Sequence, residues 1–149
     1  MNVYMTFSLF LNDFEMRNGN DSDSIVQFSA PAGSNMAVHI QNSQFHGNYG
    51  KRGGLFDFST AIGAPATFTF YAMDSIFTNN AGGSSIASLV CDGSGCESNI
   101  ELHNNTFMTN VGSLFQSNAG GDLSILNLLV ENCHLDSNID ATVGGFLQG

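Results

Sequence analysis

The sequence has few basic residues and no tryptophan. Arg17, Lys51 and Arg52 are the only basic residues besides histidine, and they oppose thirteen acidic side chains, so the formal net charge is −10. A surface with this charge repels phosphate backbones and anionic lipid surfaces. We therefore expect no nucleic acid among the partners of this chain.

The sequence also lacks a long hydrophobic run. No stretch approaches the ~20 apolar residues that a membrane-spanning helix needs, so we expect no membrane insertion. The apolar start, MNVYMTFSLFL, has neither the basic region nor the small-residue cleavage site of a signal peptide. A repeat gives a different explanation for this segment.

The repeat is marked by one aromatic or leucine residue, which we call the anchor. The anchors are Phe14, Phe45, Phe77, Phe107 and Leu135, at spacings of 31, 32, 30 and 28 residues. A nearly constant period in this range indicates a repeat architecture. The 149 residues, 42% of them hydrophobic, suffice for a single domain with a core.

Each repeat contains a strand with one buried face before its anchor. Seven residues before the anchors stand Phe7, Val38, Phe70, Ile100 and Leu128, and five before stand Leu9, Ile40, Ala72, Leu102 and Val130. The residues between these two apolar columns are mostly polar or amphipathic. The local period is therefore two, which predicts a strand. The stretch FSLFL at 7–11 is the first of these strands.

A second apolar piece follows a turn rich in Gly, Asn and Ser in every repeat. These pieces are SIVQF at 24–28, GLFDF at 54–58, SIASL at 85–89, SLFQS at 113–117 and GFLQG at 145–149. No segment shows a sustained helical stripe, and one repeat is too small to bury its own apolar face, so the repeats must stack. We predict an all-β protein: a right-handed, single-stranded parallel β-helix over residues 1–149, with about five coils of 28–32 residues and three short strands per coil.

Two columns of asparagine flank the anchor. The column three residues before it contains Asn42, Asp74, Asn104 and Asn132, and the column three residues after it contains Asn48, Asn80, Asn110 and Asn138. We predict that the first column forms a hydrogen-bonded ladder inside the bend, between coils ~4.8 Å apart. The second column is predicted to supply turn or left-handed geometry. Both are structural on this interpretation.

These motifs resemble those of a known group. The spacing Phe-x-x-Asn at 45–48, 77–80 and 107–110, with GGLF at 53–56 and GGFL at 144–147, resembles the repeats of polymorphic outer-membrane proteins and related pectate-lyase-like β-helix proteins. The resemblance implies the β-helix fold. It does not imply one function, because secreted adhesins, envelope proteins and surface proteins share such repeats. The first repeat departs from the pattern, with Leu11 and Arg17 in the two asparagine positions.

The sequence shows no catalytic cluster. β-Helix lyases and hydrolases need Ca²⁺-binding carboxylates with a nearby base, or several clustered aspartates. The outward column of the last strand, made of Gln27, Asp57, Ser88, Gln116 and Gln148, has one carboxylate. Lys51 and Arg52 precede Asp57 and suggest a surface ion pair. The four histidines fall in different columns without zinc-ligand spacing. We predict no catalytic residue, metal or cofactor.

Two loops are consistent with an oxidising compartment. Cys91 and Cys96 bracket DGSG and fit a small disulfide, with a reduced pair as the alternative. Asn20 begins a glycosylation sequon in a loop. A second sequon begins at Asn104, where the predicted burial argues against a glycan. The turn 18–24 has alternating oxygen ligands that fit either Ca²⁺ or a solvated acidic loop.

Two functional classes fit the sequence. The first is a non-enzymatic structural or adhesive module, extracellular or at the cell surface. The second is a carbohydrate-binding or carbohydrate-cleaving domain, but without tryptophan only Tyr4, Tyr49 and Tyr71 could act as amphipathic sugar platforms. Site chemistry favours the first class.

The expected partners are other copies of the chain or adjacent β-helix segments, with cell-surface glycans as the second candidate. Neither end of the repeat array has a polar cap, so we expect a longer solenoid or end-to-end stacking. Four outward apolar residues of the first strands form a candidate lateral contact: Phe10, Tyr71, Met73 and Leu129.

Overall fold

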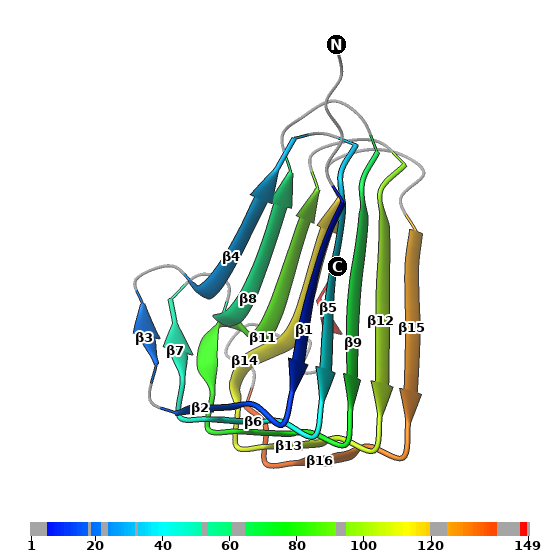
Figure 1. Cartoon of the computed structure of the whole chain (residues 1–149). Helices are drawn as coiled ribbons and strands as arrows, with labels where there is room; N and C mark the ends of the chain where they lie inside the picture. The colour runs from blue at the N-terminus through cyan, green and yellow to red at the C-terminus, as the bar shows by residue number, and fades with distance from the viewer. Residues whose placement is uncertain are drawn as a thin grey trace.

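The chain folds as a parallel β-solenoid (Figure 1). The computed structural model describes residues 6–17, 19–21, 24–31, 33–51, 54–60, 65–91, 95–119, 125–139 and 147–148. These residues form strands, bends and turns without any helix, and their paired strands are all parallel. No helix that could span a membrane is found in this part of the chain. The predicted all-β solenoid is confirmed.

Three sheets form the walls of the solenoid, and the first two each take one strand from five successive repeats. The first sheet contains β1 (Thr6–Asn12), β5 (Asn35–Gln41), β9 (Thr67–Met73), β12 (Glu97–His103) and β15 (Ile125–Glu131). The second contains β2 (Glu15–Arg17), β6 (Gln44–His46), β10 (Ile76–Thr78), β13 (Thr106–Met108) and β16 (His134–Asp136).

The third sheet is less regular than the other two. It contains β3 (Asn20–Asp21), β4 (Ser24–Ala30), β7 (Tyr49–Gly50), β8 (Gly54–Thr60), β11 (Ala81–Cys91), β14 (Val111–Ala119) and β17 (Leu147–Gln148). In the first two repeats this wall is split into two strands. In the next two it is one long strand, whose pairing shifts register between Ala81 and Ala87.

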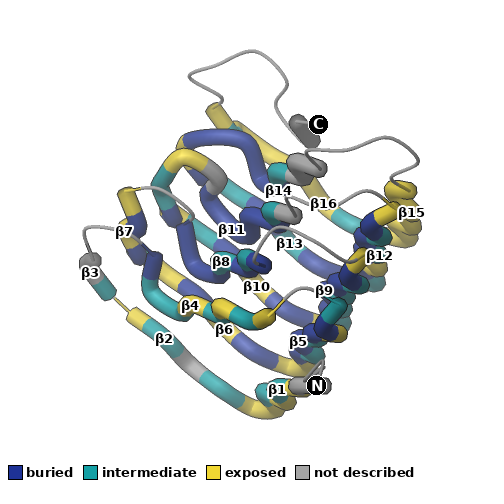
Figure 2. Tube along the Cα trace, turned by 90° about the horizontal axis from the view of Figure 1, so that it is seen from above, coloured by how far each residue is buried: buried dark blue, intermediate teal, exposed yellow. Residues whose placement is uncertain are grey.

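The core is built around a stack of phenylalanine rings. Phe45, Phe77 and Phe107 lie one above another with ring centroids 5.0 Å apart and nearly parallel planes. Phe56 and Phe115, from the third sheet, meet this stack edge-on. Figure 2 shows buried residues along the inside of β8, β11 and β14, whereas β15 is exposed along its whole length. The predicted inward columns of the first strands, such as Val38 and Ile40, are fully buried in the second to fourth repeats.

The alignment of the first repeat needs a correction of two residues. Met16, and not Phe14, pairs with the anchor Phe45. Asp13 then occupies the position assigned to Leu11, with a φ of 52°, and Leu11 pairs with the buried Ile40. The bend requires a left-handed residue, which aspartate adopts more readily than leucine. A shift of two residues leaves the strand faces unchanged.

The two asparagine columns have roles opposite to those predicted. Asn42, Asp74, Asn104 and Asn132 all have positive φ values, between 48° and 55°, and all are exposed. They end the first strand at the bend, where the backbone must turn. Inside this bend the buried polar contacts come from the next residue: the backbone N–H of Ser43 donates to Ser75 Oγ at 3.1 Å, and that of Ser75 donates to Asn105 Oδ1 at 2.9 Å.

The buried ladder lies in the second column. Each amide of Asn48, Asn80 and Asn110 donates to the side-chain oxygen one repeat further on, at 2.9, 3.1 and 2.9 Å. Asn138 ends this series and donates to the backbone oxygen of Phe107 at 2.9 Å. The left-handed geometry predicted for this column falls one residue earlier, on Gly47, Asn79, Thr109 and Ser137.

Candidate interaction surface

The outer face of the first sheet carries a row of rings. Strand register aligns one outward residue from each repeat, namely Phe10, His39, Tyr71, Glu101 and Leu129. The rings of Phe10 and His39 stack with centroids 4.8 Å apart and planes 9° apart. His39 and Tyr71 follow at 5.8 Å with tilted rings. We call Phe10, His39 and Tyr71 the aromatic row.

The four residues of the predicted lateral contact all lie on this outer face. Phe10 is 71% exposed and Leu129 is 43% exposed, whereas Tyr71 and Met73 are partly buried. The hydroxyl of Tyr71 donates to Met73 Sδ at 3.4 Å. Phe10, Tyr71 and Leu129 share one row, and Glu101 separates Tyr71 from Leu129 within it. Contact of this face with a partner stays a prediction.

Stacking against a sugar ring requires a ring face that is open to solvent. Phe10 stacks on His39 through one face and is still 71% exposed, whereas the rings further along the row have ring neighbours on both sides. Tyr71 lies between the rings of His39 and His103, with centroids 5.8 and 5.6 Å away. The geometry is that of a ladder of rings along the solenoid axis, which stabilises neighbouring strands.

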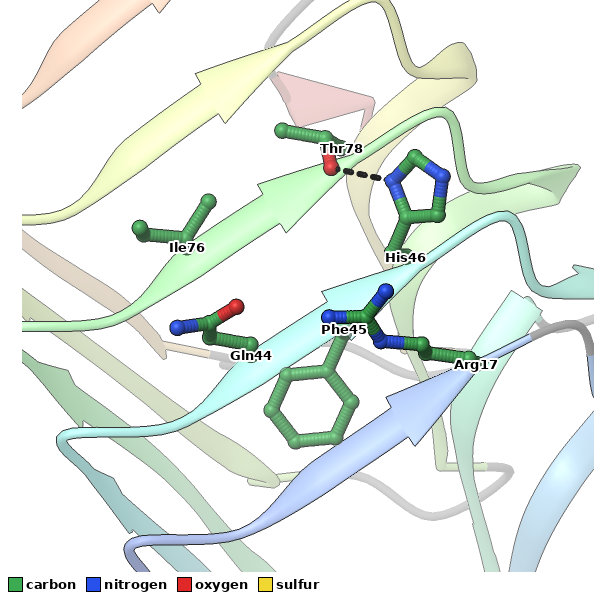
Figure 3. Close-up of a pocket in the computed structure, with 6 residues that line it drawn as sticks. All are labelled: Arg17, Gln44, Phe45, His46, Ile76 and Thr78. Atoms are coloured by element: carbon green, nitrogen blue, oxygen red, sulfur yellow. Dashed lines mark hydrogen bonds between the residues drawn. The ribbon is translucent and has the colours of Figure 1, made fainter.

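A small hollow lies on the outer face of the second sheet (Figure 3). Its volume is about 130 Å³, and it is lined by residues of three neighbouring strands: Arg17, Gln44, Phe45, His46, Ile76 and Thr78. His46 Nδ1 and Thr78 Oγ1 share a hydrogen bond of 2.8 Å. The lining contains no carboxylate and no activated nucleophile. It offers polar contacts to a small group, but no acid–base pair.

The described residues bring a histidine and a carboxylate together on the outer face of the first sheet, where His103 Nδ1 lies 3.1 Å from Glu131 Oε2. The outward row predicted for the last strand is correct in register, since Gln27, Ser88 and Asp57 align and Ser88 aligns with Gln116. This row has Asp57 as its carboxylate. Lys51 is exposed in the adjacent turn, and Arg52 lies outside the described residues. No group of three His, Cys, Asp or Glu in the described part could hold a metal ion.

The predicted loop features are only partly described. Cys96 is buried and disulfide-bonded, and Cys133 is a free thiol. The side chains of Cys91 and Asn20 lie outside the described part, so their pairing and glycosylation stay predictions. Residues 18, 22 and 23 of the proposed Ca²⁺ turn also lie outside it. Asn104 is exposed, which removes the burial argument against the second sequon.

The last coil of the solenoid exposes apolar residues that belong to the inward rows of the core. β15 is an outer strand of its sheet, and its inward residues Leu128 and Val130 are 42% and 39% exposed. Leu135 of β16, in the anchor row, is 44% exposed. At the other end, Leu9, Leu11 and Met16 are only partly buried. Both end coils therefore leave apolar surface without a covering strand in the described structure.

Charged residues at the two ends of the second sheet were missed at the sequence level. Arg17 and Asp136 occupy the same row, four repeats apart, through the pairs Arg17–His46, His46–Thr78, Thr78–Met108 and Met108–Asp136. Both side chains are exposed. The signal was hidden because Arg17 was aligned with the asparagine column, which removed it from this row.

The described residues define a parallel β-solenoid whose first and last coils carry partly exposed apolar rows. Comparison with known proteins finds no matching family model, no matching curated protein and no matching solved structure.

Proposed function

We propose that this chain is a non-enzymatic structural or adhesive module of an extracellular or cell-surface protein. It works by assembly, through its coil ends and through the outer face of its first sheet. The observation that carries this proposal is the exposed apolar surface of β15, where Leu128, Leu129 and Val130 are each about two-fifths exposed. Apolar patches of this kind are typical of interaction sites.

Two further observations support the proposal. No group of three His, Cys, Asp or Glu among the described residues could hold a metal ion, and stacked repeats present extended surfaces suited to contacts with other chains. The repeats also resemble those of polymorphic outer-membrane proteins and other pectate-lyase-like β-helices. Membership of that group is part of the proposal, and it fits a surface or appendage role.

Light scattering over a range of protein concentrations tests the proposal. We expect the chain to self-associate at micromolar concentration, and Leu129→Ser or Phe10→Ser to weaken the association. Ile76→Ser is the matched control, because Ile76 is 40% exposed but lies on the second sheet. A stable monomer that none of these substitutions affects would rule the proposal out.

A further inference from the structure

We propose that a second copy of this chain continues the solenoid at β15 and β16, in the same parallel register that joins the repeats within one copy. In this arrangement the partner's β1 pairs with β15 and the partner's β2 pairs with β16. The inference rests on the proposed function and specifies its partner and its geometry.

The internal register predicts how the two copies meet. In the first sheet every neighbouring pair of strands is joined over seven residues without a bulge. β15 and β1 are both seven residues long, and β16 and β2 are both three residues long. The next strand in the first and second sheets can therefore be supplied by the partner without any change of length.

The inward rows of the two end coils are apolar on both sides of this joint. Leu128 would meet the partner's Leu9, and Val130 would meet the partner's Leu11. Leu135 would meet the partner's Met16 in the anchor row. On the outer face Leu129 would meet the partner's Phe10, whose ring is 71% exposed. The joint buries the apolar surface that the described structure leaves open, and burial of apolar surface favours association.

Charge complementarity distinguishes this joint from other ways of covering the same surface. Continuing the second sheet by one strand, ~4.8 Å further along, places Asp136 beside the partner's Arg17. Arg17 is one of only three Lys and Arg residues in a chain with a net charge of −10. It also has an interaction within its own chain, but a guanidinium has five N–H donors and can serve a second acceptor.

One row does not continue across the joint. Asn138, the last residue of the amide ladder, would meet the partner's Gly19, which has no side chain to accept from it. The joint should therefore be weaker than the contact between two internal repeats.

A charge exchange tests the register. We expect Arg17→Asp and Asp136→Arg each to weaken self-association about tenfold or more, because each places like charges across the joint. An equimolar mixture of the two single variants should associate again, since Asp136 of one variant then meets the partner's Arg17 and the reversed pair forms at the other joint. Circular dichroism checks that each variant is folded.

The control is Lys51→Asp, which changes the net charge by the same amount as Arg17→Asp in an exposed turn away from the joint. It should leave association within about twofold of the starting protein. Association that survives both single variants, or that the mixture does not restore, would overturn the register but leave the proposed function standing. An effect of Asp136→Arg without one of Arg17→Asp would instead indicate two C-terminal ends in contact, which also overturns it. A chain that stays monomeric rejects both proposals.

Discussion

The side-chain amide of Asn80 donates a hydrogen bond to the side-chain oxygen of Asn110 at 3.1 Å, across 30 residues of sequence. The second amide hydrogen of Asn80 goes to the backbone oxygen of Phe45 at 3.1 Å. The oxygen of Asn110 also accepts from the backbone N–H of Asn80 at 3.0 Å. Each internal asparagine of the ladder therefore joins three consecutive repeats through one buried amide, and no buried side-chain N or O atom in the described structure lacks a partner.

This geometry predicts that Asn110→Leu strongly destabilises the fold. The substitution leaves the backbone N–H and amide of Asn80, and the backbone oxygen of Phe77, without their partner in a buried site. Each unsatisfied buried group costs about 1–3 kcal/mol, so we expect a loss of at least about 3 kcal/mol. Urea denaturation followed by circular dichroism measures it.

Asn104→Gly is the control for that substitution. Asn104 is exposed, has a φ of 55°, and bonds only to Asp74 through its side chain in the described structure, at 3.1 Å. Glycine adopts this φ without strain, so the change should stay within about 0.5 kcal/mol. If Asn104→Gly were the more damaging of the two, the assignment of the buried ladder would be wrong.

The sequence predicted the fold more completely than the roles of the two asparagine columns. The alternation of apolar residues predicted the inward faces of the strands. It could do so because every strand of a solenoid has one side toward the core, whichever strands pair with it. Both asparagine columns lie at bends, and asparagine alone does not show which column is buried. Asp74 could have indicated that the first column is not the ladder. A carboxylate has no hydrogen to donate, so a column that contains it cannot form a continuous donor–acceptor ladder.

The first repeat shows a second limit of sequence reasoning. Phe14 matches the anchor in residue type, whereas the true anchor is Met16. The aromatic pattern therefore selected the wrong residue. Because the error is two residues, the inward and outward faces of the strand were still assigned correctly. Arg17 and Asp136 fall in one row only in the observed register, so their alignment became visible from the strand pairing and not from the sequence.

A second prediction concerns the ring stack. Phe77 is fully buried between Phe45 and Phe107, with centroids 5.0 Å away on each side. Phe77→Ala removes both stacking contacts and leaves a cavity, so we expect a loss of about 3–5 kcal/mol in thermal or urea unfolding. Ile76→Ala, next in sequence but 40% exposed, should cost less than about 1 kcal/mol. Equal losses would contradict the inward assignment of the anchor.

A third prediction concerns the close approach of Gly50, at the end of β7, to Gly54, at the start of β8. A Cβ on Gly50 would clash with the backbone oxygen of Gly54, which cannot move without displacing β8. Gly50→Ala should therefore cost more than about 3 kcal/mol or prevent folding.

Gly95→Ala separates this clash from simple backbone strain. Gly95 has a φ of 75°, and its nearest neighbour to an added Cβ is Pro65 Cβ at 3.6 Å. We expect a loss of about 1–2 kcal/mol from the left-handed backbone alone. Soluble expression and the urea midpoint of the two variants give the comparison. A Gly50→Ala protein as stable as Gly95→Ala would show that the backbone at Gly54 moves aside at little cost.

The last prediction is that Gly19→Asn stabilises the fold. Gly19 occupies the ladder row of the first repeat, and its backbone N–H donates to Asn48 Oδ1 at 2.8 Å. The ladder therefore starts at Asn48, whose oxygen accepts no side-chain amide in the described structure. An asparagine at position 19 would add that donor, as Asn48 itself does to Asn80.

The added Cβ would approach Asn48 Oδ1 to 3.0 Å and Ile25 Cδ1 to 3.2 Å, and both are ends of side chains that can adjust. A new part-buried hydrogen bond and the smaller conformational freedom of the unfolded chain together favour a gain of about 1 kcal/mol. Gly19→Ala adds the same Cβ without the amide, so the urea midpoint should rise more for asparagine than for alanine. Equal midpoints would mean that the amide at position 19 does not join the ladder.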